Sequence, residues 1–117
     1  MSRGFTKKFC PWRSGGNSIK RIMNAPESVV TDYLRGLAAT HPEVIEFNSE
    51  ARIVQRKLLP AQPKVGLISG GGSGCEPMHS GYVGFGGLDA ACPGEIFTSP
   101  VPAQIMAATE RAESGKG

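Results

Sequence analysis

The sequence of 117 residues has few cysteines and no long apolar run. Its three cysteines, Cys10, Cys75 and Cys92, are odd in number and show no C-x-x-C spacing, which disfavours both a disulfide framework and a zinc ribbon. A reducing cytoplasm is therefore the expected location. No apolar stretch approaches the length of a membrane span, and residues 1–18 lack the apolar core of a secretory signal, so no membrane partner is expected.

The formal net charge of +3 is unevenly distributed along the chain. Residues 1–21 carry six Lys and Arg and no acidic residue, whereas residues 22–117 carry seven basic and ten acidic residues, a balance of −3. The body has no basic cluster with interleaved aromatic residues, and no nucleic-acid partner is expected. Residues 1–18 are basic like an organelle transit segment, but their Pro and Gly residues disfavour an amphipathic helix. We interpret 1–18 as a basic disordered extension and 19–117 as the domain.

Apolar periodicity and turn residues predict an α/β protein. Asn24 is expected to cap a helix with Glu27 at the capping-box position, and His41-Pro42 is expected to end it. Short strands are expected at 44–47 and 52–55, buried strands at 64–69 and 88–92, and later helices at 76–82 and 101–113. Thr98-Ser99-Pro100 is expected to supply the N-cap of that last helix and a proline at its first position. Ile105, Met106 and Thr109 are expected to share one face of the helix.

The order strand, loop, helix, strand, helix predicts a partial parallel sheet with right-handed crossover helices. Parallel sheets are normally covered on both faces by several crossovers, and two parallel strands do not form a stable sheet by themselves. We therefore expect the chain to be the front part of a larger α/β domain. Alone, it is expected to be marginally stable.

The stretch from Val65 to Pro77 combines an apolar strand signal with four glycines, Gly70, Gly71, Gly72 and Gly74. Glycines without a Cβ let backbone amides approach a ligand closely, and a following helix would add its own free amides. Cys75 and Glu76 stand where a phosphate-binding loop needs Lys and Ser or Thr, and Cys75 replaces the third glycine of a dinucleotide fingerprint. The pattern favours a neutral ligand rich in hydroxyls; a tight turn or linker is the alternative.

Cys75 and His79 are four residues apart and would share one face of a helix. Two side chains do not make a metal site, because zinc sites in proteins use at least three protein ligands. No metal is expected, and His79 is expected to be a surface or interface side chain.

Three blocks resemble the N-terminal part of the substrate-binding K subunit of dihydroxyacetone (glycerone) kinases. They are Gly70–Met78, Gly81–Gly84 and Leu88–Pro100, and the resemblance extends from about Ile19 to residue 117. It implies a domain that holds a short-chain ketone such as dihydroxyacetone while a phosphoryl group is transferred to its hydroxyl. The donor would be ATP-Mg on a nucleotide-binding L-type domain or subunit, or a phosphotransferase partner. No cofactor is expected on this chain, and the family is commonly dimeric.

The resemblance also implies the substrate-binding residues: Gly72, Ser73, Gly74 and the position of Cys75. The family has a histidine at that last position, thought to act on the substrate hydroxyl, so no complete catalytic set is expected here. A thiol with an ordinary pKa of about 8.5 is a weak proton acceptor at neutral pH. Also missing are the family's histidine that bonds covalently to the ketone and its downstream Lys and Asp. We expect a chain that is inactive alone; the alternatives are a ketone-binding regulatory relative and a fragment with no stable fold.

Overall fold

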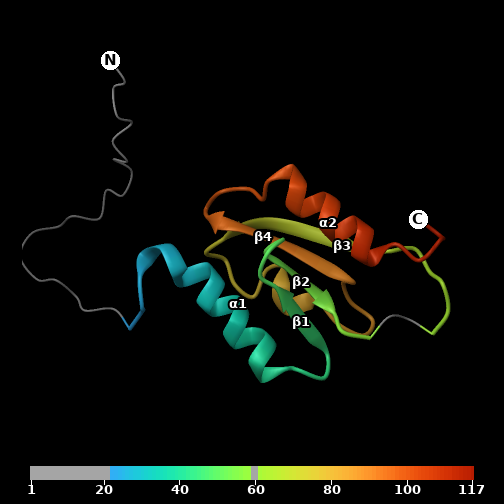
Figure 1. Ribbon diagram of the computed structural model, residues 1–117, viewed down its shortest axis with the longest axis horizontal. Helices are drawn as coiled ribbons and strands as arrows, with labels where there is room; N and C mark the ends of the chain where they lie inside the picture. Colours follow the sequence, from blue (N-terminus) through green and yellow to red (C-terminus); the bar gives the residue numbers. More distant parts are fainter. Residues whose placement is uncertain (1–21, 59–60) are drawn as a thin grey trace, which may run out of the picture.

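The computed structural model describes residues 22–58 and 61–117, so the expectations for residues 1–18 and Cys10 lie outside the described part. Two helices cover opposite faces of one four-stranded sheet (Figure 1). The elements are α1 (Val29–Thr40), β1 (Ile45–Asn48), β2 (Ile53–Arg56), β3 (Ile68–Ser73), β4 (Ala90–Ile96) and α2 (Pro102–Ala112), with 3-10 turns at Pro26–Ser28 and Ser80–Tyr82.

The sheet has the order β1-β2-β4-β3. β3 and β4 are parallel, as expected, whereas β1 pairs with β2 and β2 with β4 in antiparallel fashion, so the sheet is mixed. β1 and β2 are antiparallel because they form a hairpin. The Asn48 side chain accepts hydrogen bonds from the amides of Glu50 and Ala51, both at 3.0 Å, and Arg52 adopts a positive φ of 54°.

Helix α1 packs on one face of the sheet through the apolar positions that the sequence pattern predicts. Val30 and Leu34 are buried against Val54 and Ala91. The helix ends at Thr40, as His41-Pro42 predicts, but the expected N-cap is wrong: the Asn24 amide instead donates to the Asp32 carboxylate at 3.0 Å. A 3-10 turn precedes the helix because Pro26 lies there without an amide proton.

Helix α2 covers the other face and begins at Pro102 after Val101, so the N-cap expected within Thr98-Ser99-Pro100 is wrong. Its buried side chains are Gln104 and Ala108, whereas Ile105 and Met106 are 44% and 64% exposed, contrary to the expected apolar face. Gln104 is buried because its amide has partners: Nε2 donates to the carbonyls of Arg52 and Pro93, each at 3.1 Å, and Oε1 accepts from the Val101 amide.

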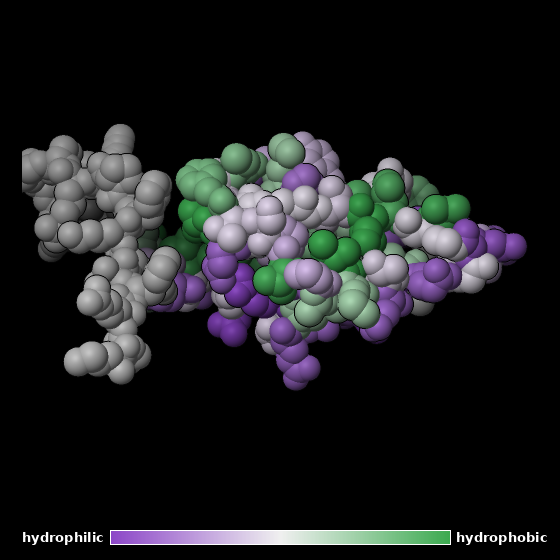
Figure 2. Space-filling model, turned by 90° about the horizontal axis from the view of Figure 1, so that it is seen from above, coloured by the Kyte–Doolittle hydropathy of each residue, from purple (hydrophilic) through white to green (hydrophobic). Residues whose placement is uncertain are grey.

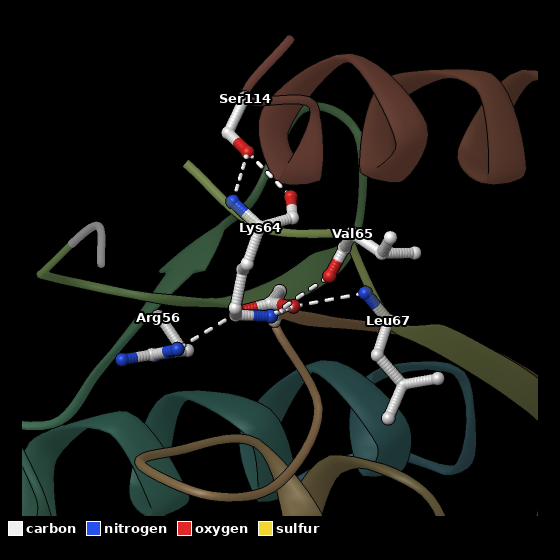
Figure 3. A network of polar contacts seen from close by, with 6 residues as sticks. Arg56, Lys64, Val65, Leu67 and Ser114 are labelled. Carbon is white, nitrogen blue, oxygen red and sulfur yellow. Dashed lines mark hydrogen bonds and ion pairs between the residues drawn. The ribbon is translucent and has the colours of Figure 1, made fainter. Parts of the chain in front are cut away.

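An ionic network joins three parts of the chain where the parallel strands β3 and β4 begin (Figure 3). Asp89, which is 8% exposed, accepts hydrogen bonds from Arg56 Nη1 at 2.9 Å, from the Leu67 amide at 2.8 Å and from Lys64 Nζ. Burial acts to raise the pKa of Asp89, but the donors Lys64, Leu67 and Arg56 outweigh it and hold that pKa below its usual value.

The position of β3 differs most from the sequence-based expectation. The strand begins at Ile68 and runs through Gly70, Gly71 and Gly72, so these three glycines are part of the sheet and not of a loop after it. Val65 and Leu67, expected to be buried, are 67% and 54% exposed. Glycine is required here by close packing: a Cβ on Gly70 would lie 2.6 Å from the Cys92 carbonyl oxygen of the neighbouring strand.

Candidate functional site

The candidate site lies where the parallel strands β3 and β4 end. Ligands of open α/β sheets bind beyond the carboxyl ends of the strands, and Gly74 and Cys75 follow β3 at this place. The expected helix 76–82 is wrong: the segment forms turns and one 3-10 turn, with the Gly81 amide bonded to the Pro77 carbonyl at 2.8 Å. No helix N-terminus therefore contributes amides within this segment.

Two of the four residues implied by the family are structural in this geometry. A Cβ on Gly72 would lie 2.8 Å from the Thr98 backbone nitrogen, so the missing side chain lets the segment after β4 approach β3. Ser73 is 3% exposed, and its hydroxyl donates to the Gly94 carbonyl at 2.7 Å. This bond fixes the ends of the two strands relative to each other.

Gly74 and Cys75, the other two residues, are exposed at the strand end. Gly74 has a φ of +116°, which favours glycine, and its amide donates to both carboxylate oxygens of Glu76 at 3.1 Å. The Glu76 carboxylate thus accepts from a backbone amide that the sequence analysis expected to be available to a ligand. The Cys75 thiol is free and exposed, whereas Cys92 is buried and its burial raises the pKa of its thiol.

His79, expected from the sequence to be a surface or interface side chain, is half-buried between the turn segment and β3. Its Nδ1 lies 2.9 Å from the Ser69 hydroxyl, and its Nε2 lies 2.7 Å from where a Cβ on Gly71 would be. The glycine in β3 therefore makes room for the imidazole, and the imidazole holds the turn segment against the strand. Cys75 and His79 do not share a helix, and residues 22–58 and 61–117 contain no group of three or more His, Cys, Asp or Glu placed to hold a metal.

Phe97 is the residue of this region that the sequence analysis did not single out. It has a positive φ of 52°, uncommon for a bulky residue, and its amide donates to the Ser73 carbonyl at 2.7 Å. Its ring, mostly exposed, lies beside Gly74, where a Cβ would be 2.8 Å from the ring carbon Cε1. Backbone strain has no reliable signature in a single sequence.

The strand end thus offers a small hydrogen-bonding surface. It presents one amide already bonded to a carboxylate, one exposed thiol and one aromatic ring, next to the buried hydrogen bond between Ser73 and Gly94. Such groups bind and orient a polar molecule.

Comparison with known proteins identifies the family of this arrangement. The model of the Dak1 domain matches residues 35–117. The dihydroxyacetone-binding subunit DhaK of the PEP-dependent dihydroxyacetone kinase of Escherichia coli is 44% identical over 99 residues, which cover 85% of this chain and 28% of that subunit. The corresponding PTS-dependent subunit of Lactococcus lactis is 47% identical over 100 residues, 86% of this chain and 30% of its own length.

Solved structures agree with the sequence matches. The dihydroxyacetone kinase of C. freundii superimposes with a TM-score of 0.70 at 33% identity, over 81% of this chain and 18% of that one. A dihydroxyacetone kinase operon co-activator, DhaQ, gives a TM-score of 0.68 at 40% identity, over 74% and 26% of the two chains. The chain spans less than a third of the length of these relatives. It belongs to the Dak1 domain family, as the resemblance of its glycine-rich blocks implies.

Proposed function

We propose that this chain forms the front part of a ketone-binding K-type domain of a dihydroxyacetone kinase, with Gly74 and Cys75 at the edge of the ketone site. The observation that supports the proposal most directly is the Gly74 amide, exposed at the carboxyl end of a parallel strand and bonded to Glu76. A ketone or hydroxyl oxygen is an acceptor of the same kind as the Glu76 oxygens. It can take the place of one of them on the amide.

The charge beside this amide selects against anionic ligands. A second negative group placed about 4 Å from the Glu76 carboxylate costs about 1 kcal/mol in water and several times more in a partly enclosed site. A neutral ketone avoids this cost. The phosphoryl group that the reaction requires would therefore come from a donor held elsewhere, on a nucleotide-binding L-type domain or a phosphotransferase partner; the C. freundii kinase has been solved with AMP-PNP and Mg²⁺.

The chain alone should bind a ketone weakly and not phosphorylate it. Three or four neutral hydrogen bonds at about 1 kcal/mol each give about 3–4 kcal/mol, a dissociation constant of millimolar or weaker. The Cys75 thiol replaces the imidazole expected to act on the substrate hydroxyl, and the groups that would bond the ketone covalently lie outside this sequence. Tight capture and turnover need those groups.

An NMR titration tests the proposed site. Dihydroxyacetone added to the labelled chain should shift the amide signals of Gly74 and Cys75 in a saturable way at millimolar concentrations, while dihydroxyacetone phosphate shifts them less. The amide signal of Val30, a buried residue of α1, serves as an internal control that should not shift. Equal or larger shifts with the phosphate, or shifts confined to other regions, would contradict the proposal.

A second measurement separates the kinase from the regulatory alternative. The curated relatives compared above are kinase subunits, which is why we propose a kinase rather than the co-activator role of DhaQ. In a full-length protein that carries this segment, Cys75→His should raise phosphorylation of dihydroxyacetone by about 10²-fold or more, the usual contribution of a general base. A full-length protein without a rate gain would favour the regulatory role.

A further inference from the structure

A small cavity with two cations in its wall lies at the opposite end of the sheet from the proposed ketone site. Its volume is about 340 Å³, near the lower end of the range of ligand cavities in proteins. Arg56 ends β2, and Lys64 and the turn 85–87 precede β3 and β4, so this cationic cavity lies where the parallel strands begin. The ketone site lies where they end, about 20 Å away along the six residues of β3. The cavity is lined by Arg56, Ala61, Lys64, Phe85, Gly86 and Gly87.

The wall of the cationic cavity carries an excess of positive charge. Arg56 and Lys64 approach the same carboxylate, that of Asp89, from different segments of the chain (Figure 3). Among the described residues, Asp89 is the one acidic side chain that pairs with either cation, and two cations with one carboxylate leave a net charge of +1. Both carboxylate oxygens are already in use, Oδ1 by Arg56 and Oδ2 by Lys64 and the Leu67 amide. Asp89 therefore neutralises only one of the two cations.

The arginine has hydrogen-bonding capacity beyond this ion pair. A guanidinium group has five N–H donors, and the contacts of the Arg56 side chain with described residues use Nη1 alone. The side chain is only 11% exposed, so little of it is open to bulk water. Buried polar groups are normally hydrogen-bonded, and two coplanar acceptor oxygens match the fork of a guanidinium. Because Arg56 lines the cavity, a carboxylate in the cavity could supply such acceptors.

An aromatic ring forms another part of the wall. Phe85 lies in a tight turn, where the Gly87 amide donates to the Gly84 carbonyl at 3.1 Å and the Gly84 amide donates to the Leu88 carbonyl at 3.0 Å. Phe85 is 97% exposed. Exposed apolar residues form several groups on the face seen in Figure 2, so an exposed ring alone does not mark a site. Here the ring borders a cavity with two cations, and the two kinds of group together suit a ligand with an anionic and an apolar part.

We propose that the cationic cavity binds a small aromatic monocarboxylate. Its carboxylate accepts hydrogen bonds from Arg56 beside the charge of Lys64, and its ring covers the side chain of Phe85. A single negative charge balances the net charge of +1, whereas a phosphate monoester carries nearly two charges at neutral pH and would exceed it. The proposal does not rest on ketone binding, so failure of the titration at Gly74 and Cys75 leaves it unaffected.

Titration with benzoate tests the proposal. Benzamide is the matched probe without the charge, and acetate is the carboxylate without the ring. In NMR spectra at neutral pH and constant ionic strength, benzoate should shift the amide signals of Gly86 and Gly87 and the Arg56 Nε–H signal in a saturable way. Benzamide and acetate should each bind at least about fivefold more weakly, because each lacks one of the two interactions.

Two substitutions separate the charge from the ring. Lys64→Gln removes the net charge and should weaken benzoate binding by about fivefold. Its matched control is Lys57→Gln, because Lys57 is exposed and donates to the Pro42 carbonyl at 2.8 Å outside the cavity; this change should affect binding far less. Phe85→Ala should weaken benzoate binding by about fivefold and leave acetate binding unchanged.

Several results would overturn the proposal. They are an absence of benzoate shifts at Gly86 and Gly87, benzamide binding as tight as that of benzoate, and equal losses for Lys64→Gln and Lys57→Gln. Inorganic phosphate that binds more tightly than benzoate at the same signals would also overturn it, because the cavity would then prefer a dianion. If Lys64→Gln does not fold, benzoate binding to the unsubstituted chain decides: weakening by added KCl supports the ionic contact, and binding independent of salt overturns it.

Discussion

Replacement of Asp89 by Asn should destabilise the chain more than any other single charge removal in the ionic network described above. The Asp89 carboxylate accepts three hydrogen bonds, two of them from the cations Arg56 and Lys64, and it is 8% exposed. Removing one partner of a buried ion pair costs about 3–5 kcal/mol, because the remaining charge stays buried. Asn keeps an acceptor oxygen for one donor, which puts the expected loss near the lower limit, about 3 kcal/mol.

The matched control is Glu95→Gln. Glu95 also pairs with an arginine, Arg52, at 2.6 Å, but its side chain is 58% exposed, and exposed pairs contribute about 0–1 kcal/mol. In urea unfolding followed by circular dichroism, a slope of about 1.5 kcal/mol per molar converts 3 kcal/mol into a midpoint shift of about 2 M. A shift for Asp89→Asn no larger than that for Glu95→Gln would refute the reasoning.

Three further predictions concern the same structure. Stability should fall as the pH drops below about 4, because folding lowers the pKa of Asp89. The ionised carboxylate stabilises the fold above its unfolded pKa of about 3.9, and this stabilisation is lost as the pH falls through the lower folded pKa. Acid titration followed by the far-UV circular dichroism signal measures the loss, and Asp89→Asn should make it smaller. Gly70→Ala should lower the free energy of unfolding by about 1–3 kcal/mol, because the new Cβ meets Cys92. Gly36→Ala in α1, where a Cβ has nothing within 4 Å, should raise it by about 0.5–1 kcal/mol in the same urea assay. A gain in stability at both sites would contradict the packing argument. In a Cys10→Ser background, iodoacetamide should modify exposed Cys75 well before buried Cys92, as peptide mapping would show, and equal rates would mean that β4 opens readily.

Much of the fold follows from local patterns in the sequence. The apolar spacing of Val30 and Leu34 predicts α1, and the short β-like pieces predict the two strands of the hairpin within one residue. The family is also indicated correctly, because the glycine-rich blocks are long and specific. These features depend on residues close together in the sequence.

The rest depends on contacts between distant residues. A run of glycines resembles a loop in any single sequence, and only the approach of Cys92 to Gly70 and of His79 to Gly71 makes these glycines part of a strand. Gln104 is buried although it is polar, because its side-chain amide donates hydrogen bonds to the Arg52 and Pro93 carbonyls. No local rule identifies such partners.

The buried Gln104 side-chain amide also restricts which of the segments around the ends of β3 and β4 is able to move. It holds the hairpin turn at Arg52, the middle of β4 at Pro93 and the start of α2 at Val101, so a displacement of any of them would leave polar groups without partners. Residues 74–78, by contrast, are exposed and are held by turns and exposed hydrogen bonds, and the segment is anchored only beyond them, where His79 contacts Ser69. Conformational adjustment to an incoming guest should therefore occur as a hinged movement of that outer flap against a stationary base.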